Sequence, residues 1–451
     1  MIHATTLELA AKMGASLLGS GERMVEGVAI DSRALTPRNV FFALRGARVD
    51  GHEFTAQAMA AGAAAAVVSH SVPLDLPQLL VADTLHALGR LARVERAAAP
   101  YRLAAVTGSI AKTTTKEFLA ALLATIFPVG LTHGNRNSET GFPVELLNQP
   151  GGITWMVAEL GMSHAGELDR LGVIAQPDAV LYTVIAPVHL EFFPSIEAIA
   201  VAKAELIPHL RRDGLLVLNA ADPRVAALGG RFAGNAVRYG LPGGSDLWIE
   251  RYESHGLLGA AFALAGPLGH ADIEWTLAGR HQADNLLAAA ALALAIGVPP
   301  AALAPCAADL RPAPRRGEIH RLRGSITVVD DSYNSSPEAA KALLALLAVT
   351  PGRRVAVLGE MLELGANAPE LHREVGRRAG AVAQLVVAVG GDPAVELARA
   401  ANGTEAHHVA EAGAALALLR SLVRPGDVVL VKGSRGIGLD RVVDGLLREG
   451  F

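Results

Sequence analysis

The feature that most constrains this chain of 451 residues is the repeated alternation of short apolar runs with helix-type segments. Such alternation favours right-handed βαβ units, whose strands form a mainly parallel sheet. The runs that we interpret as strands are residues 40–44, 64–69, 103–107, 154–159, 179–184, 215–219, 326–330, 354–358, 385–389 and 428–431. Helical patterns separate them, including residues 54–62, 84–98 and 113–127. The sequence therefore predicts an α/β protein.

Two breaks divide this pattern. A helical segment ends at Ala99, before Pro100, and proline disfavours helix in the residue that precedes it. The stretch RPAPRRG at 311–317 interrupts all periodicity and is typical of a linker. We therefore predict three domains, covering residues 1–99, 100–312 and 313–451.

Charge and cysteine content exclude several classes of protein. With 40 Lys and Arg against 44 Asp and Glu, the net charge is −4, so the chain lacks the basic character of a nucleic-acid binder. Its single cysteine, Cys306, excludes an internal disulfide framework and a cysteine-based zinc site.

The most apolar segment, LLAAAALALAIGV at 286–298, has 13 residues, whereas a membrane span needs about 20. We predict a buried core helix there and no insertion into a membrane. The start, MIHATTLELAAKMG, lacks a basic stretch followed by a long apolar core, so we expect no signal peptide. The expected location is the cytoplasm, and a monomer is compatible with the sequence.

The strongest local motif is VTGSIAKTT at 106–114, which follows a strand-type run and precedes a helical one. Backbone N–H groups at a helix N-terminus can bind phosphate, a lysine adds positive charge and a threonine hydroxyl can bind Mg²⁺. Ala111 stands where the usual phosphate loop has glycine, and alanine is costly if the backbone there needs positive φ. From this motif alone, an ordinary strand–helix turn remains the alternative.

Polar residues also follow the next predicted strands. Glu159 ends one strand and begins ELGMSH, and a carboxylate at such a place is suited to Mg²⁺. His189 follows another, and Lys203 lies on the helix beyond it. Taken singly, the histidine could be a capping residue and the lysine a solvated one. Their common place at or just beyond strand ends favours a ligand site, because open α/β sheets bind ligands at that edge.

These motifs carry a resemblance to the Mur ligases, the ATP-dependent amide-forming enzymes of peptidoglycan synthesis. GSIAKT approximates the family loop G-[ST]-x-G-K-T, and THGNRNSETGFPVELL, GRHQADNLLAAAALA, VVDDSYNSSPEA and VLVKGSRG are similar to further family segments. VAIDSRALTPRNVFFALRGARVDGHEF resembles the family's uridine-nucleotide domain. VVDDSYN together with VLGEMLELG is similar to the members that add D-alanyl-D-alanine, and we find no D-N-P-R motif of the diaminopimelate-adding members.

The resemblance implies a fold and a reaction. The fold would be an N-terminal α/β domain that binds UDP, a central P-loop-type domain with a mainly parallel sheet, and a Rossmann-like C-terminal domain that closes over ATP. The reaction would join D-alanyl-D-alanine to UDP-N-acetylmuramoyl-tripeptide through an acyl phosphate, with ATP and Mg²⁺.

The resemblance also implies residue roles. The phosphate loop would comprise Thr107, Gly108, Ser109, Ile110, Ala111, Lys112, Thr113 and Thr114. Thr113 and Glu159 would hold one Mg²⁺, and His189 and Lys203 a second, with Lys203 carbamylated; Lys112, Glu159, His189 and Lys203 would be the catalytic residues. Asn285, Arg316 and Asp331 would contact the nucleotide. The UDP-peptide would be bound by Ser32, Arg33, Asp50, Gly51, His52, Asn135, Asn137, Ser163 and His164, and the dipeptide by Tyr333, Asn334, Lys432 and Arg435.

Two departures keep alternatives open. Ala111 replaces the loop glycine, and Ser138 replaces an asparagine of the family pattern. A ligase with another amino acid or dipeptide, a ligase of a specialised pathway, or a nucleotide-binding homologue weakened by Ala111 would each be compatible with the sequence.

Overall fold

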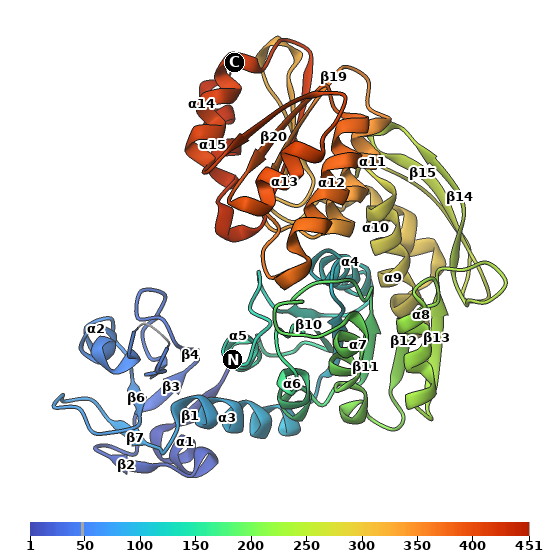
Figure 1. The fold of residues 1–451 in the computed structure, drawn as a ribbon. Helices are drawn as coiled ribbons and strands as arrows, with labels where there is room; N and C mark the ends of the chain where they lie inside the picture. Colours follow the sequence, from blue (N-terminus) through green and yellow to red (C-terminus); the bar gives the residue numbers. More distant parts are fainter. Residues whose placement is uncertain (47–48, 451) are drawn as a thin grey trace.

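The computed structural model describes residues 1–46 and 49–450 and divides into three lobes (Figure 1). Ala47 and Arg48, which belong to the run similar to a uridine-nucleotide domain, lie outside the described residues, as does Phe451. Within the described part of the chain, no helix is both long enough and apolar enough to cross a membrane.

The first lobe carries a five-stranded sheet in the order β2-β7-β6-β5-β4, parallel except for β2. Its elements are β1 (His3–Thr5), α1 (Thr6–Met13), β2 (Ser16–Leu18), β3 (Met24–Glu26), β4 (Val28–Ala29), β5 (Val40–Phe42), α2 (Thr55–Ala60), β6 (Ala65–Val68), β7 (Gln78–Leu80) and α3 (Thr84–Ala98). Helix α3 starts where the Asp83 side chain accepts a hydrogen bond from the His86 N–H, which satisfies one of the free amides of the first turn. The structure confirms the helix expected at 84–98.

Helix α3 also joins this lobe to the next. Arg96, almost fully buried, donates to the carbonyl of Ala175 at 2.8 Å and to Asp178 at 2.8 Å. The Asn148 side chain exchanges hydrogen bonds of 2.9 and 2.8 Å with the backbone of Val28. Because a buried guanidinium must keep its hydrogen bonds, these contacts fix the first lobe against the second.

The second lobe is built on an all-parallel sheet in the order β13-β12-β11-β8-β10-β9. Its elements are β8 (Arg102–Thr107), α4 (Lys112–Ala124), β9 (Val129–Leu131), α5 (Gly141–Leu147), β10 (Trp155–Glu159), α6 (Glu167–Ala175), β11 (Ala179–Tyr182), α7 (Ile196–Ala204), β12 (Leu215–Asn219), α8 (Pro223–Ala227) and β13 (Asn235–Tyr239). The strands expected at 103–107, 154–159, 179–184 and 215–219 are confirmed, and the parallel order confirms the fold class.

An antiparallel sheet beside this lobe was not predicted from the sequence. It consists of β14 (Trp248–Ser254), β15 (Ala260–Ala265) and β16 (Ala271–Trp275), and it packs with α9 (Arg280–Ile296) and α10 (Leu303–Asp309) (Figure 1). Strand β16 alternates buried and exposed residues. A half-exposed strand such as β16 contains no continuous apolar run, so a search for such runs does not detect it. Strand β15, by contrast, is a mostly buried apolar run that the sequence analysis left unassigned.

Helix α9 confirms the expected buried helix, although it begins earlier, at Arg280. Its Ala and Leu side chains are buried between the parallel sheet, α4 and the antiparallel sheet. A helix that is apolar on all sides is stable in water only when surrounded in this way.

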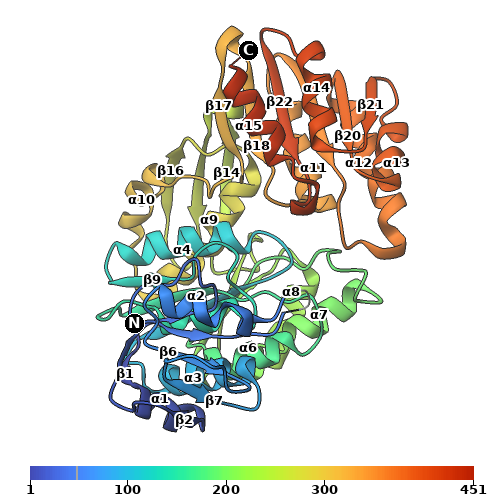
Figure 2. The same ribbon diagram turned by 90° about the vertical axis from the view of Figure 1, so that its left-hand side faces the viewer.

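The third lobe is a three-layer α/β domain with the strand order β17-β18-β22-β19-β20-β21, parallel except for β17 (Figure 2). Its elements are β17 (Glu318–Arg321), β18 (Thr327–Asp331), α11 (Pro337–Ala348), β19 (Arg353–Gly359), α12 (Ala368–Val382), β20 (Leu385–Val389), α13 (Asp392–Ala400), β21 (Glu405–Val409), α14 (Ala412–Leu422), β22 (Asp427–Lys432) and α15 (Asp440–Glu449). One face of the sheet packs against α11, α12 and α13, and the other against α14 and α15. The segment 311–317 contains no helix or strand, as expected for a linker.

Candidate active site

A cleft of about 510 Å³ separates the second lobe from the third, and most residues with expected nucleotide or dipeptide roles line it. Strand ends of both sheets meet there, because β8 and β10 lead into one wall and β18 and β22 into the other. The expected residues that line it are Ser109, Ile110, Ala111, Lys112, Thr113, Thr114, Asn135, Asn137, Glu159, Ser163, His189, Asn285, Arg316, Asp331, Tyr333, Asn334, Lys432 and Arg435. Such an edge is where open α/β sheets bind ligands.

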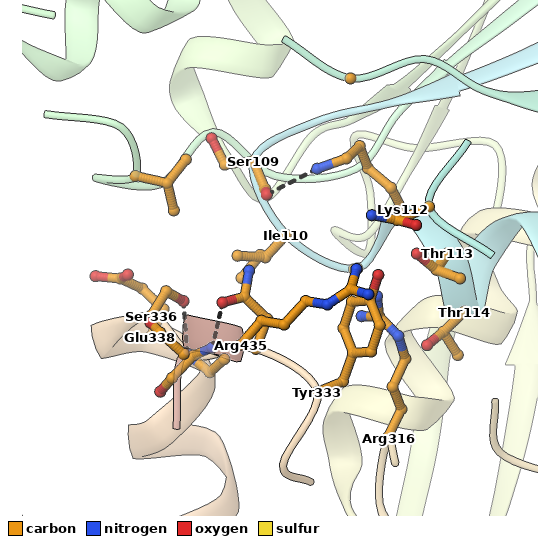
Figure 3. A pocket seen from close by; sticks show the side chains of 18 of the residues that line it. Ser109, Ile110, Lys112, Thr113, Thr114, Arg316, Tyr333, Ser336, Glu338 and Arg435 are labelled. Carbon is orange, nitrogen blue, oxygen red and sulfur yellow. Dashed lines mark hydrogen bonds between the residues drawn. The ribbon is translucent and has the colours of Figure 1, made fainter. Parts of the chain in front are cut away.

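The loop between β8 and α4 forms one wall of the cleft (Figure 3). Gly108 has φ +147°, and a Cβ there would overlap the Thr183 hydroxyl, so this position requires glycine. Helix α4 starts at Lys112, whose Nζ donates to the Ser109 carbonyl at 3.0 Å. The first-turn amides of a helix have no partner within the helix and can bind an anion. Neither Thr107 nor Gly108 lines the cleft itself, so both contribute through the backbone course of the loop.

Ala111 adopts the left-handed conformation, with φ 70° and ψ −8°. This is the backbone that glycine adopts without cost and that an L-residue with a Cβ rarely adopts. The loop therefore keeps a glycine-type course at the price of local strain.

We expect Ala111→Gly to raise the free energy of unfolding by about 0.5–1 kcal/mol, since the relief of strain at positive φ exceeds the added entropy of the unfolded chain. Urea unfolding measures the change. Ala121→Gly, in the interior of α4, is the matched control and should lower stability by about 1 kcal/mol. A loss of stability in both variants would contradict the strain argument.

Glu159 lies at the end of β10 and is 3% exposed. Its two oxygens accept hydrogen bonds of 2.6 Å from the Thr113 hydroxyl and 2.6 Å from the Asn137 amide. The carboxylate thus lies beside the first turn of α4, and the Glu159 N–H donates to Thr132 Oγ1 at 3.0 Å. A hydroxyl and a carboxylate held together in this way are hard oxygen donors of the kind that Mg²⁺ prefers.

Burial changes the acid–base properties of two lysines at this wall. Lys203, near the end of α7, is 1% exposed, and burial lowers its pKa well below the usual value, reinforced by the nearby charge of Lys112. Desolvation in the cleft also lowers the pKa of Lys112, against the opposing effect of Glu159. Lys203 does not line the cleft, yet it is close enough to both side chains to be affected by their charges. The alternative interpretation of Lys203 as a solvated helix lysine is therefore wrong.

His189 lies on the loop after β11 and has a left-handed backbone, with φ 57°. Its Nδ1 is bonded to the carboxylate of Glu363, which belongs to the third lobe, and this hydrogen bond lowers the pKa of Glu363. The histidine is therefore a contact between the two walls of the cleft.

The serine and the histidine of the ELGMSH segment, Ser163 and His164, both contact Glu167. The Ser163 N–H donates to Glu167 at 2.7 Å, and His164 contacts the same carboxylate at 3.2 Å. The His164 ring packs on Phe192, with ring centroids 4.4 Å apart. Ser163 lines the cleft, whereas His164 does not.

The opposite wall carries a cluster of charges. Lys432, at the end of β22, forms an ion pair with Asp331 and donates a hydrogen bond to the Asn334 carbonyl at 2.9 Å. The Tyr333 ring contacts two guanidinium groups, with Arg316 4.2 Å and Arg435 5.7 Å from its centroid (Figure 3). These cations line the same cleft as the loop 107–114, and guanidinium and ammonium groups are suited to anionic ligands.

Several residues that line the cleft were given no role in the sequence analysis, among them His281, Gln282, Glu338 and Glu363. The first two lie in the first turn of α9 beside Asn285, whose amide donates to Gln282 at 3.4 Å. Burial lowers the pKa of His281. His281 and Gln282 belong to the GRHQADN segment, so this motif was the signal that could have identified them. Glu338 follows DSYN in the sequence, and Glu363 lies within GEMLELG.

The residues expected to bind the uridine nucleotide lie in the first lobe, outside this cleft. The Ser32 hydroxyl donates to Gln57 at 3.0 Å, and Arg33 pairs with Asp31, which lowers the pKa of that carboxyl to about 2. Asp50 accepts from the buried His52 ring at 2.6 Å. Gly51 packs so closely on the Leu44 backbone that a Cβ would meet its N and O at 2.6 Å.

The fold and the cleft together define an α/β protein with a phosphate-type loop facing a second domain. The family described as Mur ligase middle domain matches residues 106–293, the Mur ligase glutamate ligase domain matches 315–435, and the Mur ligase family catalytic domain matches 24–126. The chain belongs to the Mur ligase family.

Individual relatives are similar to this chain over its whole length or nearly so. The chain is 35% identical to the UDP-N-acetylmuramoyl-tripeptide--D-alanyl-D-alanine ligase of Escherichia coli strain K12, with 100% of both proteins covered. It is similar in structure to MurF from Acinetobacter baumannii, with a TM-score of 0.90, 29% identity and 99% of each chain covered. It is also similar to the MurF ligase of Thermotoga maritima in complex with ADP, with a TM-score of 0.82 and 29% identity. The match covers 94% of this chain and 98% of that one.

Proposed function

We propose that this chain is an ATP-dependent, ADP-forming ligase that joins D-alanyl-D-alanine to UDP-N-acetylmuramoyl-tripeptide in peptidoglycan precursor synthesis. The observation that carries the proposal is the cleft, in which Lys112 and Glu159 on one wall face Lys432 and Arg435 on the other. The relatives of this activity cover the chain from end to end.

For ATP, we propose the loop 107–114 as the phosphate site. The amides of the first turn of α4 and the Lys112 ammonium offset the charge of the β- and γ-phosphates. Asn285 at the start of α9 is assigned to the adenine, with Arg316 and Asp331 contacting the nucleotide from the third lobe. The ADP complex of the Thermotoga maritima relative supports nucleotide binding.

For Mg²⁺, the donor set fits. Thr113 and Glu159 would hold one ion, because the Thr113 hydroxyl and a Glu159 carboxylate oxygen already lie within hydrogen-bond distance of each other. His189 and a carbamylated Lys203 would hold the second. Burial lowers the pKa of the Lys203 amine and so favours its unprotonated form, which is the form that reacts with CO₂. When bound, the ions supply positive charge beside the reacting phosphate and carboxylate.

For the peptide substrates, the chain offers two further sets. Ser32, Arg33, Asp50, Gly51 and His52 are assigned to the uridine nucleotide. Asn135, Asn137, Ser163 and His164 are assigned to the peptide that reaches from the first lobe towards the cleft. Tyr333, Asn334, Lys432 and Arg435 are assigned to the incoming dipeptide, whose carboxylate suits the basic side chains.

The reaction follows from this placement. The terminal carboxylate of the tripeptide attacks the γ-phosphorus and ADP leaves, which gives an acyl phosphate. The dipeptide amine then attacks the acyl carbon, loses a proton, and inorganic phosphate leaves as the amide forms. Lys112 holds the phosphates in line, and the cleft keeps water from the acyl phosphate.

We expect ADP to form rapidly only when ATP, Mg²⁺, UDP-N-acetylmuramoyl-tripeptide and D-alanyl-D-alanine are all present. A coupled ADP assay, with each component left out in turn, measures this dependence. D-alanine in place of the dipeptide should give much less product. ADP formation that is equally fast without the dipeptide would mean a simple ATPase, and our substrate assignment would be wrong.

The strained Ala111 favours one second candidate, a nucleotide-binding homologue with little turnover. The same assay separates the two. Undetectable ADP formation by the wild-type chain, restored in Ala111→Gly, would support the binding protein. A ligase with a different amine substrate would instead turn over ATP with another amino acid or dipeptide.

A further inference from the structure

The loops 188–192 of the second lobe and 362–365 of the third form a clasp across the cleft. Besides the bond between His189 Nδ1 and the Glu363 carboxylate, the Glu191 N–H donates to the Glu363 carbonyl at 3.2 Å. A Cβ on Gly365 would lie 3.0 Å from the Leu190 carbonyl oxygen. Backbone, side chain and close packing thus all join the same two loops.

The two bonded residues share an unusual backbone. His189 has φ 57° and Glu363 has φ 63°, so both are non-glycine residues in the left-handed region. Such conformations persist where surrounding contacts fix them, and they cluster at sites where side-chain direction matters. Here they direct the imidazole and the carboxylate towards each other.

The bond occupies one ring nitrogen of the imidazole. A carboxylate at Nδ1 of His189 favours the tautomer in which Nδ1 is the donor, because an ionised carboxylate only accepts hydrogen bonds. In that tautomer Nε2 is the nitrogen with a lone pair, through which histidine binds a metal ion. A carboxylate on the other ring nitrogen typically orients a metal-bound histidine and makes it a better ligand.

We propose that Glu363 is a positioning residue that fixes the tautomer and direction of His189 for a divalent cation, so that closure of the third lobe completes the metal site. This inference rests on the proposed function, because it takes His189 as a metal ligand. The second lobe by itself supplies the histidine, and the third lobe supplies the group that orients it.

The test uses the full chain with Mn²⁺, a non-hydrolysable ATP analogue and UDP-N-acetylmuramoyl-tripeptide. Electron paramagnetic resonance titration counts bound ions, and spin-echo modulation from ¹⁴N detects imidazole on Mn²⁺. We expect a ¹⁴N signal in the wild type that His189→Ala removes. Glu363→Ala should weaken Mn²⁺ binding by about tenfold or more and reduce the signal.

Two variants serve as matched comparisons. Glu363→Gln keeps an oxygen that accepts from Nδ1–H, so it should retain the signal and most of the affinity. Glu191→Ala removes an exposed carboxylate from the same clasp and should leave both unchanged. Circular dichroism on every variant verifies the fold.

The proposal is overturned if Glu363→Ala binds Mn²⁺ with wild-type affinity and an unchanged signal, or if the wild type shows no ¹⁴N signal. Failure of the proposed function is distinguishable. A wild-type chain that shows the expected Mn²⁺ behaviour but forms no ADP with all three substrates contradicts the ligase and leaves the role of Glu363 intact.

Discussion

Lys112→Ala should reduce the rate of ADP formation by about a thousandfold or more, because this side chain lies at the proposed phosphate site and is the one cation of the loop 107–114. Two anions, the phosphate and the substrate carboxylate, must approach each other. Without the lysine, their repulsion raises the barrier directly.

We expect the loss of activity in Lys112→Ala to occur without a loss of thermal stability. The cleft desolvates Lys112 and lowers its pKa, so removal of the ammonium relieves an electrostatic cost. Steady-state kinetics and thermal unfolding on the same preparation test this. Lys341→Ala, which removes a lysine paired with Glu374 on the third lobe, is the control and should stay near wild-type activity. An active Lys112→Ala would mean that the loop does not bind phosphate.

Lys203→Ala should lose activity by about a hundredfold to a thousandfold, since the variant cannot form the carbamate proposed as a metal ligand. The neighbouring Lys112 charge disfavours an ammonium at Lys203 but favours a carbamate anion. Added formate or acetate should restore part of the activity by supplying the missing carboxylate oxygens. Lys203→Arg should not restore activity, because a guanidinium forms no carbamate and presents no oxygen ligand.

Lys203→Met separates chemistry from packing, because it fills a similar volume in a position that is 1% exposed. We expect a folded and inactive protein. Removal of dissolved CO₂ and bicarbonate should lower the activity of the wild type and leave Lys203→Met unchanged. Near-normal activity of Lys203→Met would show that the residue only packs.

The sequence predicts most elements whose pattern is strongly periodic or continuously apolar. The helix at 84–98 and the strands at 215–219 and 385–389 have the expected bounds. The β14–β16 sheet was not predicted. Strands β14 and β16 are partly exposed and contain no continuous apolar run, whereas β15 is a mostly buried apolar run that was left unassigned. The domain boundaries stay a prediction, although α3 packs on the second lobe through Arg96.

The sequence by itself determined which chemical groups this protein has and near which strand ends they lie. The loop 107–114, Glu159 and Lys432 belong to local motifs, so their neighbours in the chain place them. Only the tertiary structure decided that Ala111 has positive φ, that Lys203 is buried and that Glu363 meets His189, 174 positions away. Backbone strain, desolvation and contacts between distant loops arise from packing in three dimensions, and no local pattern of residues encodes them.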